Sequence, residues 1–407
     1  MFYKAKAFTS ISLRWQPTLE GVRSRMSRAD IIIGGDVCPT PRNEAYFRQG
    51  DSGALLNDLL PLFKNADLRI VNLECPLIDR PSPIFKRRPV LGTSSQCING
   101  LIACGIDILC LANNHNYDHG RQGLYNTLET CRSAGIEAVG AGRSLQEARH
   151  MLVRSVNGLR LGIIAMAQSE FSIASEDSAG AAPLDAIDFI RHVRNARGNT
   201  DHVIVIVHGG NEYYPYPSPR LMQLCRFMIE EGASAVICQH SHCPGCYEEY
   251  DGGIIVYGQG NLLFDAQTEQ SCWWQGFLIR LSLEPNAKPS MDIIPYTQSK
   301  AHVGAKRMDP EQETRFLRSL EERSTAISDR SFVLKEWAKY CDTQRNAYYG
   351  RLCRFSHFLG RLGATGVVAK AFASCADLPS IINVIRCEAH REALLHILED
   401  DLRRRHR

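Results

Sequence analysis

The 407-residue sequence has no run of about 18 apolar residues, so we expect no membrane-spanning helix. It also lacks the continuous hydrophobic segment that a secretory signal peptide needs, which predicts a cytoplasmic protein, with peripheral membrane association as the alternative. Repeats and low-complexity stretches are missing too, and this excludes collagen-like and wholly disordered chains. Residues 1–26 are interpreted as an N-terminal extension, either disordered or untranslated, since Met26 stands just before the first predicted strand.

The chain has little net charge, with 47 Lys and Arg against 44 Asp and Glu, a formal charge of +3. Residues 31–300 nevertheless carry a net charge of −6. A segment of that sign repels nucleic acid unless bound cations invert it, so we expect no nucleic-acid partner. The 15 cysteines are scattered along the chain, which favours reduced thiols over a disulfide framework.

Short β-branched runs alternate with helical patterns in the middle of the chain, as is typical of an α/β protein. We therefore predict an α/β domain over residues 27–300 and a helical C-terminal region over residues 301–407. The predicted strands are Asp30–Gly34, Leu68–Leu73, Ile106–Leu111, Ile136–Val139, Leu161–Met166, His202–His208, Ala235–Cys238, Gly253–Tyr257, Gly276–Leu283 and Met291–Pro295. The predicted helices of the α/β domain include Gly120–Ser133, Leu184–Arg197 and Arg220–Glu231.

Several of these strands end in residue types that bind metals: Asp36, Glu74, Asn113, Asn114, His115, His208, His240 and His242. Because the carboxyl ends of parallel strands line one crevice, these side chains are expected to converge. Alone, each has an ordinary interpretation, such as a helix cap for Asp36 or a surface carboxylate for Glu74. Together they form a mixed nitrogen and oxygen ligand set that suits Mn, Fe, Zn or Mg.

Histidines at positions 240 and 242 give the sharpest single signal. Alternate residues of an extended segment point the same way, so both imidazoles are expected to face one centre. The whole set exceeds what one four-coordinate ion requires, which predicts two divalent ions, of Mn, Fe or Zn, bridged by a carboxylate. Such a pair holds a phosphate oxygen, activates water and inverts the negative charge of the segment.

Further residues are candidates for supporting roles. Glu212 and Tyr213 offer an acid and an aromatic face at the expected rim of the site, for substrate binding, with a proline-stiffened loop as the alternative. Asn261 and Asp265 are candidates for orienting the ligating histidines, with turn and helix-cap roles equally open.

In the C-terminal region, Glu388, Arg391 and Glu392 share one face of a predicted helix. Residues spaced by three and four positions on a helix form ion pairs at the surface, so this face is expected to be solvated. A partner-docking face is the alternative.

The ordered motifs resemble those of the CapA family of bacterial capsule-synthesis proteins, which includes the poly-gamma-glutamate capsule biosynthesis proteins. The resemblance covers about residues 29–265 and rests on Gly35–Asp36, Asn72–Leu77, Leu111–His115, His208–Tyr213, His240–His242 and Tyr257–Asn261. The family is in turn similar to calcineurin-like metallophosphoesterases. This implies a four-layer α/β/β/α metallophosphoesterase-like sandwich carrying the C-terminal helical appendage.

The resemblance also implies roles for single residues. The metal ligands would be Asp36, the bridging Glu74, Asn114, His208, His240 and His242. The catalytic pair would be Asn114 and His115. His115 would bind the phosphate oxygen or protonate the leaving group. Asn113, Glu212 and Tyr213 would bind substrate. Cys38 stands where such phosphoesterases have a histidine, so it either weakens one metal site or ligates as a thiolate.

The expected function is that of a metal-dependent phosphoesterase-type hydrolase in the biosynthesis of a bacterial capsule, either polysaccharide or polyglutamate. The expected partners are the capsule or surface polymer as substrate, and synthase or export proteins. The alternative is a non-catalytic assembly or polymer-binding protein of a capsule synthesis complex. A third option is hydrolysis of an amide or ester, because an activated water also attacks a carbonyl.

Overall fold

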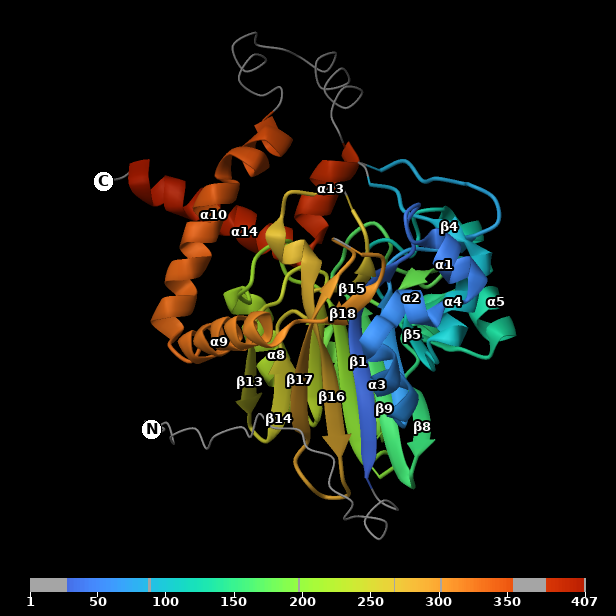
Figure 1. Cartoon of the computed structure of the whole chain (residues 1–407). Coiled ribbons are helices and arrows are strands. Elements are labelled where there is room, and N and C mark those ends of the chain that lie inside the picture. Colours follow the sequence, from blue (N-terminus) through green and yellow to red (C-terminus); the bar gives the residue numbers. More distant parts are fainter. Residues whose placement is uncertain are drawn as a thin grey trace.

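Two β-sheets pack face to face in the computed structural model, which describes residues 28–86, 89–196, 198–266, 268–300, 302–353 and 378–405 (Figure 1). The larger sheet has the order β18-β17-β16-β1-β2-β5-β6, and β15 also pairs with β1. Its strands are β1 (Ala29–Cys38), β2 (Leu68–Leu73), β5 (Ile108–Cys110), β6 (Glu137–Val139), β15 (Asn261–Phe264), β16 (Gln275–Leu283), β17 (Ser290–Gln298) and β18 (Ala305–Arg307). The extension predicted over residues 1–26 lies outside the described residues.

The second sheet has six strands in the order β13-β14-β12-β11-β9-β8. They are β8 (Leu152–Val156), β9 (Leu159–Ala167), β11 (His202–His208), β12 (Ala235–Gln239), β13 (Tyr247–Tyr250) and β14 (Gly253–Val256). Two small two-stranded sheets join β3 (Leu77–Ile78) to β4 (Thr93–Ser94) and β7 (Ala141–Gly142) to β10 (Gly180–Ala181).

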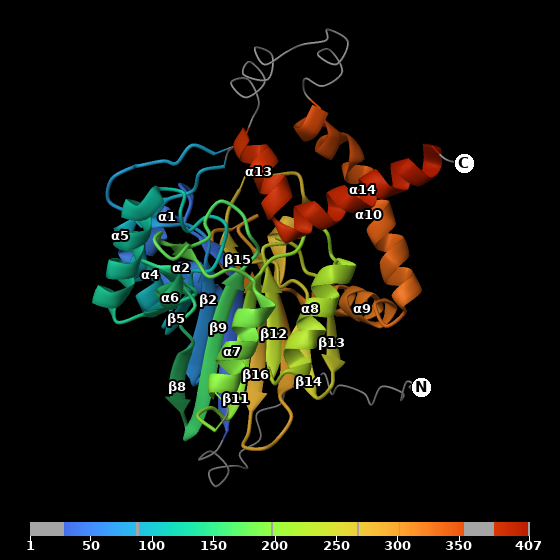
Figure 2. The ribbon, with the colours of Figure 1, turned by 180° about the vertical axis from the view of Figure 1, so that it is seen from behind.

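Helices cover the outer faces of both sheets. The larger sheet is covered by α1 (Glu44–Gln49), α2 (Ser52–Leu56), α3 (Leu60–Asn65), α4 (Ile98–Ala103) and α5 (Gly120–Ala134), and the second by α7 (Ala186–Ala196) and α8 (Pro219–Glu230), as seen from behind in Figure 2. The remaining helices are α6 (Leu145–Ala148), α9 (Pro310–Ala326), α10 (Arg330–Cys353), α13 (Leu378–Arg386) and α14 (Glu388–Arg405). None of the described helices is long and apolar enough to cross a bilayer.

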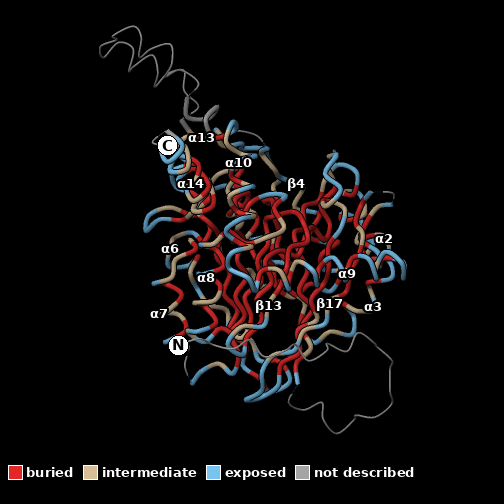
Figure 3. The backbone as a smooth tube through the Cα atoms, turned by 90° about the vertical axis from the view of Figure 1, so that its left-hand side faces the viewer, coloured by how far each residue is buried: buried red, intermediate tan, exposed pale blue. Residues whose placement is uncertain are grey.

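The strands are apolar on both faces because each face meets a different layer. In β1, Ile31 and Ile33 point into the core between the two sheets, while Ile32 between them packs under the helices. In β9, Ile163 faces the other sheet and Ile164 faces α7 and α8. Successive side chains of a strand point to opposite faces, so a continuous apolar run builds two cores at once. The buried strands form the centre of the molecule in Figure 3, and the four-layer α/β/β/α prediction is confirmed.

The parallel strands of both sheets finish at the same end of the molecule. In the larger sheet β1, β2 and β5 run parallel, and in the second sheet β9, β11, β12 and β14 do. Helices α13 and α14 lie over this end in both Figure 1 and Figure 2. The convergence predicted for the strand-end side chains therefore has its structural basis here.

A glycine pair near the end of β1 lets two backbones approach each other. The pairing of β1 with β2 shifts register between Ile33 and Asp36, and β1 then pairs with β15 at Asp36 and Asn261. A Cβ atom on Gly35 would lie only 1.9 Å from the carbonyl oxygen of Gly260. The missing side chain at Gly35 thus allows β15 to dock beside Asp36.

We predict that Gly35→Ala lowers the free energy of unfolding by about 3 kcal/mol or more, because neither backbone can move aside without breaking the strand pairing. Gly53→Ala is the matched control, since its added Cβ would meet only a side-chain oxygen of Asp51 at 3.4 Å. The control is expected to be neutral or up to about 1 kcal/mol more stable. Urea denaturation followed by circular dichroism measures both. Equal stability of the two variants would contradict the close-approach argument.

Candidate metal centre

Two buried carboxylates from the larger sheet form the floor of the site. Asp36 lies in β1, where its Oδ1 accepts a 2.7 Å hydrogen bond from the amide of Asn72 and its Oδ2 a 3.2 Å bond from the backbone of His240. Glu74 directly follows β2 and is fully buried, and among the described residues neither of its carboxylate oxygens has a hydrogen-bond partner. Burial, together with the nearby charge of Asp36, raises the pKa of Glu74 well above its usual range. Glu74 is therefore a buried acid that needs a cationic partner.

The second sheet supplies two neutral imidazoles. His208 ends β11, and its Nε2 lies 3.4 Å from Glu74 Oε1 and 3.1 Å from Nδ1 of His240. Burial lowers the pKa of His208 to about 4, and burial lowers that of His240 to about 3. Both rings are uncharged at neutral pH, which is the state that binds a metal.

A third imidazole, His242, lies on the other side of Glu74. Its Nδ1 is 2.8 Å from Asn261 Oδ1, and its Nε2 is 3.7 Å from Glu74 Oε1. Burial opposes protonation of His242, but the carboxylates of Glu74 and Asp36 raise its pKa above the ordinary value. The ring packs against Trp273 with 4.6 Å between centroids. The contact with Asn261 holds Nδ1 of His242 and leaves Nε2 facing Glu74, while the orienting role of Asn261 stays a prediction.

The segment that carries the last two histidines is not extended. Strand β12 ends at Gln239, and both His240 (φ 91°) and His242 (φ 52°) adopt the left-handed region. The predicted geometry was therefore wrong, although both rings do meet at Glu74. Positive φ is strained for a residue with a β-carbon and is concentrated at functional sites, where tertiary contacts impose it.

The asparagine pair after β5 has two different environments. Asn114 Oδ1 lies 2.9 Å from His208 Nε2, so this amide oxygen joins the histidine cluster. Asn113 is turned the other way: its amide donates to Asn72 Oδ1 (3.0 Å) and to the carbonyl of Leu73 (2.8 Å), and its oxygen accepts from the backbone of His115 (3.1 Å). These bonds give Asn113 a positioning role, and its predicted contact with substrate stays a prediction.

His115 is held by an ion pair that sequence reasoning missed. Its Nδ1 lies 2.7 Å from Asp118 Oδ2 and 3.3 Å from Lys86 Nζ, and Lys86 also pairs with Asp118. Burial lowers the pKa of His115, and the hydrogen bond to Asp118 opposes the shift. Asp118 accepts the Nδ1 proton, which leaves Nε2 outside the ion pair.

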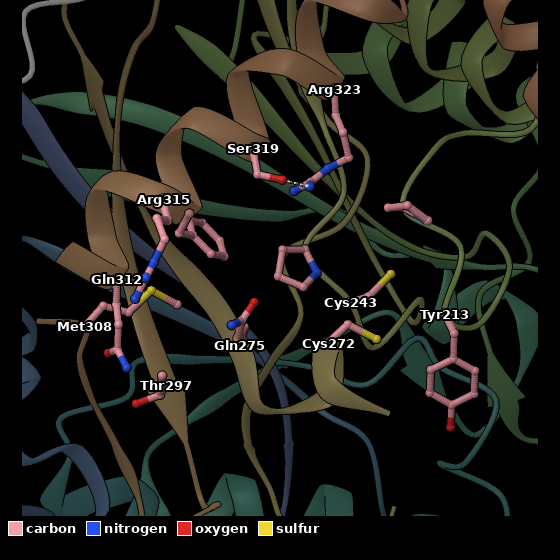
Figure 4. A pocket seen from close by; sticks show the side chains of 13 residues that line it. Tyr213, Cys243, Cys272, Gln275, Thr297, Met308, Gln312, Arg315, Ser319 and Arg323 are labelled. Atoms are coloured by element: carbon pink, nitrogen blue, oxygen red, sulfur yellow. Dashed lines mark hydrogen bonds between the residues drawn. The ribbon is translucent and has the colours of Figure 1, made fainter. Parts of the chain in front are cut away.

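Glu212 and Tyr213 are exposed, and their predicted contact with substrate stays a prediction. The Tyr213 ring is 6.4 Å from that of His242, and it borders a cavity of about 460 Å³ that extends to Met308 (Figure 4). Arg315 and Arg323 of α9 also line this cavity. The rim therefore combines an aromatic face with cationic groups beside the metal-ligand residues.

Two other candidates lie elsewhere. Asp265 forms a 2.5 Å ion pair with Arg42, so the orienting role predicted for it has no supporting contact among the described residues. Cys38 packs in the hydrophobic core under the helices, and its hydrogen bond with Cys75 and its burial raise its thiol pKa well above the usual range. The described residues thus give no support to Cys38 as a thiolate ligand.

Sequence reasoning also missed Glu170, which follows β9 and lies 3.7 Å from His240. The strand-end rule, by which functional side chains follow the carboxyl ends of parallel strands, applies to β9 as to the other strands. It would have found Glu170. The predicted solvated face of α14 was wrong: Glu388 accepts hydrogen bonds from the backbone (2.7 Å) and hydroxyl (2.9 Å) of Ser169, and Glu392 accepts one from the backbone of Arg220 (2.9 Å). Helix α14 is thereby fastened beside the site.

The donor set fits divalent metal ions. Two groups of ligand atoms lie close enough to hold an ion, and Glu74 belongs to both: Asp36, Glu74 and His242 form one, and Glu74, His208 and His240 form the other. Oxygen and imidazole donors of this kind suit Mn, Fe or Zn. A dication held by these residues would supply a cationic partner for the buried Glu74 carboxylate.

Comparisons with known proteins agree with these motifs. The family described as "Bacterial capsule synthesis protein PGA_cap" matches residues 30–266, more than half of the chain. The chain is 27% identical over 278 residues to the capsule biosynthesis protein CapA of Bacillus anthracis, and the match spans 65% of the length of each protein. It is 27% identical over 294 residues to the PGA biosynthesis protein CapA of Bacillus subtilis (strain 168), covering 70% of this chain and 76% of that protein.

Among solved structures, the calcineurin-like phosphoesterase YfkN from Bacillus subtilis is similar, with a TM-score of 0.38 and 12% sequence identity. The similarity covers 76% of this chain and 99% of that one.

We predict that Asn261→Ala weakens Mn²⁺ binding about 10- to 100-fold, because His242 loses the group that orients its ring. Asp265→Asn is the control, since Asp265 contacts Arg42 rather than an imidazole. Isothermal titration of the metal-free protein measures both affinities. An unchanged affinity in Asn261→Ala would show that His242 is not a ligand or needs no orientation.

Proposed function

This chain belongs to the PGA_cap family of bacterial capsule synthesis proteins, and on that basis we propose that it is a metal-dependent hydrolase of phosphoesterase type. Its substrate would be a phosphoester, or a related bond, of a bacterial surface polymer during synthesis. The observation that carries the proposal is the position of Glu74. In the part of the chain that the structure describes, this fully buried carboxylate has no hydrogen-bond partner, and it is shared by two groups of metal-ligand atoms.

The ligand residues divide into two positions around Glu74. Asp36 and His242 form one group with Glu74, and His208 and His240 form the other, with Asn114 Oδ1 close to His208 Nε2. Two divalent ions bound there supply an electrophile for the phosphate oxygens and lower the pKa of a water molecule. The contribution of the chain is to hold the ligands before binding, and Asn72 does so by placing its amide nitrogen 2.7 Å from Asp36 and 3.2 Å from His208.

The role proposed for His115 is proton transfer at Nε2. Its Nδ1 is engaged by Asp118, which fixes the orientation of the ring and stabilises its protonated form. The Nε2 proton would pass to the leaving oxygen as its bond to phosphorus breaks. Lys86 also pairs with the carboxylate of Asp118, and it therefore limits how strongly Asp118 favours the protonated form of His115.

The cavity beside Tyr213 supports a polymeric and anionic substrate. It leads away from His242, and the guanidinium groups of Arg315 and Arg323 line it, although Arg315 also pairs with Glu311 at 2.9 Å. A strand of polymer with negative charge would lie there with one bond at the metal-ligand residues. Synthase or export proteins as partners, and a cytoplasmic location, remain part of the proposal.

We expect purified protein to hydrolyse bis-p-nitrophenyl phosphate, to lose this activity on chelation and to regain it with Mn²⁺. Asp36→Asn and His240→Ala should each abolish turnover while leaving circular dichroism nearly unchanged, because each removes a ligand rather than a core side chain. His396→Gln is the control, since this histidine lies on α14 and is outside every metal-ligand group. Full activity in either ligand variant, or metal binding without turnover of any ester, would contradict the hydrolase and favour the assembly protein.

His115→Asn is expected to lower kcat about 10²- to 10⁴-fold, the usual contribution of a positioned proton donor. The metal content should stay at the wild-type level, because His115 belongs to neither ligand group around Glu74. Steady-state kinetics and elemental analysis of the same preparation separate the two effects. Loss of metal in this variant would instead make His115 a ligand.

A further inference from the structure

The junction between α13 and α14 brings two more metal-binding side chains to the edge of the site. Cys387 lies between the two helices, and His390 lies in the first turn of α14. Cys387 Sγ and His390 Nε2 each lie 4.0 Å from Oε1 of Glu170. The three ligand atoms thus come from two segments more than 200 residues apart in the sequence, and they form a third group able to hold a metal ion.

The spacing suits zinc in particular. Zn–S bonds of about 2.3 Å and Zn–N or Zn–O bonds of about 2.0 Å place the ligand atoms of a tetrahedral site roughly 3.5 Å apart. The observed 4.0 Å needs a shift of only about half an ångström to reach that value. Thiolate, imidazole and carboxylate together are a donor set typical of zinc rather than of magnesium or calcium.

The histidine of this group is already oriented. Its Nδ1 lies 2.8 Å from the hydroxyl of Tyr348 in α10, so its Nε2 is the nitrogen that faces Glu170. Metal-ligating histidines usually have their second nitrogen held in this way. Cys387 is buried, and burial together with the carboxylate of Glu170 raises the pKa of its thiol well above the usual range, although the backbone N–H groups of His390 and Ala389 at the start of α14 oppose the shift. A dication would reverse that balance.

Two carboxylates of α14, Glu388 and Glu392, hold these three ligand residues in place without any metal. Glu388 accepts hydrogen bonds from the backbone N–H and the hydroxyl of Ser169, the residue before Glu170. Glu392 accepts hydrogen bonds from the hydroxyl of Ser218 (2.5 Å) and from the backbone N–H of Arg220. Helix α14 is thereby fastened to the loop after β9 and to the start of α8. Cys387 and His390 approach Glu170 as a result of this docking.

We propose that Glu170, Cys387 and His390 form a separate zinc site that clamps the C-terminal helices onto the α/β domain. Binding forms bonds to Sγ, Nε2 and a carboxylate oxygen, and it releases the thiol proton of Cys387 to solvent. Because Glu170 Oε1 also lies 3.7 Å from His240 Nε2, the clamp adjoins the candidate metal centre. The proposal goes beyond the hydrolase function and does not depend on it.

Cobalt provides the test, because a thiolate bound to Co²⁺ gives a near-ultraviolet charge-transfer absorption that oxygen and imidazole ligands do not. Among the described cysteines, only Cys387 belongs to a metal-ligand group, so the band reports this site and not the centre around Glu74. We expect the metal-free full chain to develop the band on titration with Co²⁺ and to lose it in Cys387→Ser. His390→Gln should weaken Co²⁺ binding at least about tenfold.

Cys272→Ser is the matched control, since the hydrogen bond with Cys243 lowers the pKa of Cys272 to about 7 and makes this thiol easier to ionise than the buried Cys387. The band should persist in this variant, and also in Asp36→Asn, in which only the centre around Glu74 is altered. Elemental analysis should show the zinc content falling by about one equivalent in Cys387→Ser and in His390→Gln. No band in the wild type at saturating Co²⁺, or an unchanged band in Cys387→Ser, would overturn the proposal. If Cys387→Ser does not fold, His390→Gln provides the test, and unchanged Co²⁺ binding and zinc content in that variant would overturn the proposal.

Discussion

A buried carboxylate that has no hydrogen-bond partner among the described residues is the constraint around which this molecule is arranged. Glu74 directly follows β2, with His208 Nε2 at 3.4 Å and His242 Nε2 at 3.7 Å from its Oε1, in surroundings where an isolated negative charge costs several kcal/mol. The neighbouring charge of Asp36 increases this cost. The surrounding imidazoles offset this cost only in part. His242 is the one member of the cluster whose pKa the carboxylates raise, so it is the one that more readily carries a positive charge. A site of this kind is poised for cations.

The two sheets contribute different chemistry to that site. The larger sheet provides the carboxylates and the amide of Asn114, and the second sheet provides the imidazoles. Their relative position is set by the inter-sheet core and by polar links such as Gln239 Nε2, which donates to the carbonyl of Gly34 (2.9 Å) and to Gln259 (3.1 Å). The C-terminal helices add a third contribution through Glu388 and Glu392. The site thus depends on the packing of three parts of the chain that are remote in sequence.

Much of the fold was predictable from residue order. The strands Leu68–Leu73 and His202–His208 were predicted to the residue, because continuous β-branched runs buried on both faces leave few alternatives. The short edge strands β8, β13 and β18 were missed, since partly exposed strands have weaker patterns. The strand-end rule found the carboxylates and histidines, but it failed on the conformation of His240 and His242, where tertiary contacts impose a positive φ.

The sequence by itself determined the strands and their polar ends through local periodicity, and the metal-ligand types through residue chemistry. The four-layer arrangement was anticipated only from the resemblance to a known family. Only the tertiary structure decided which candidates meet. It turned Asn113 inward and Asn114 toward His208, paired Asp118 with His115, and buried Cys38 in the core. It also brought Cys387 and His390 to Glu170, a contact between segments more than 200 residues apart. Side-chain direction and long-range docking depend on packing against partners that the local sequence does not specify. The residues of the site could therefore be anticipated from the sequence, but their relative positions could not.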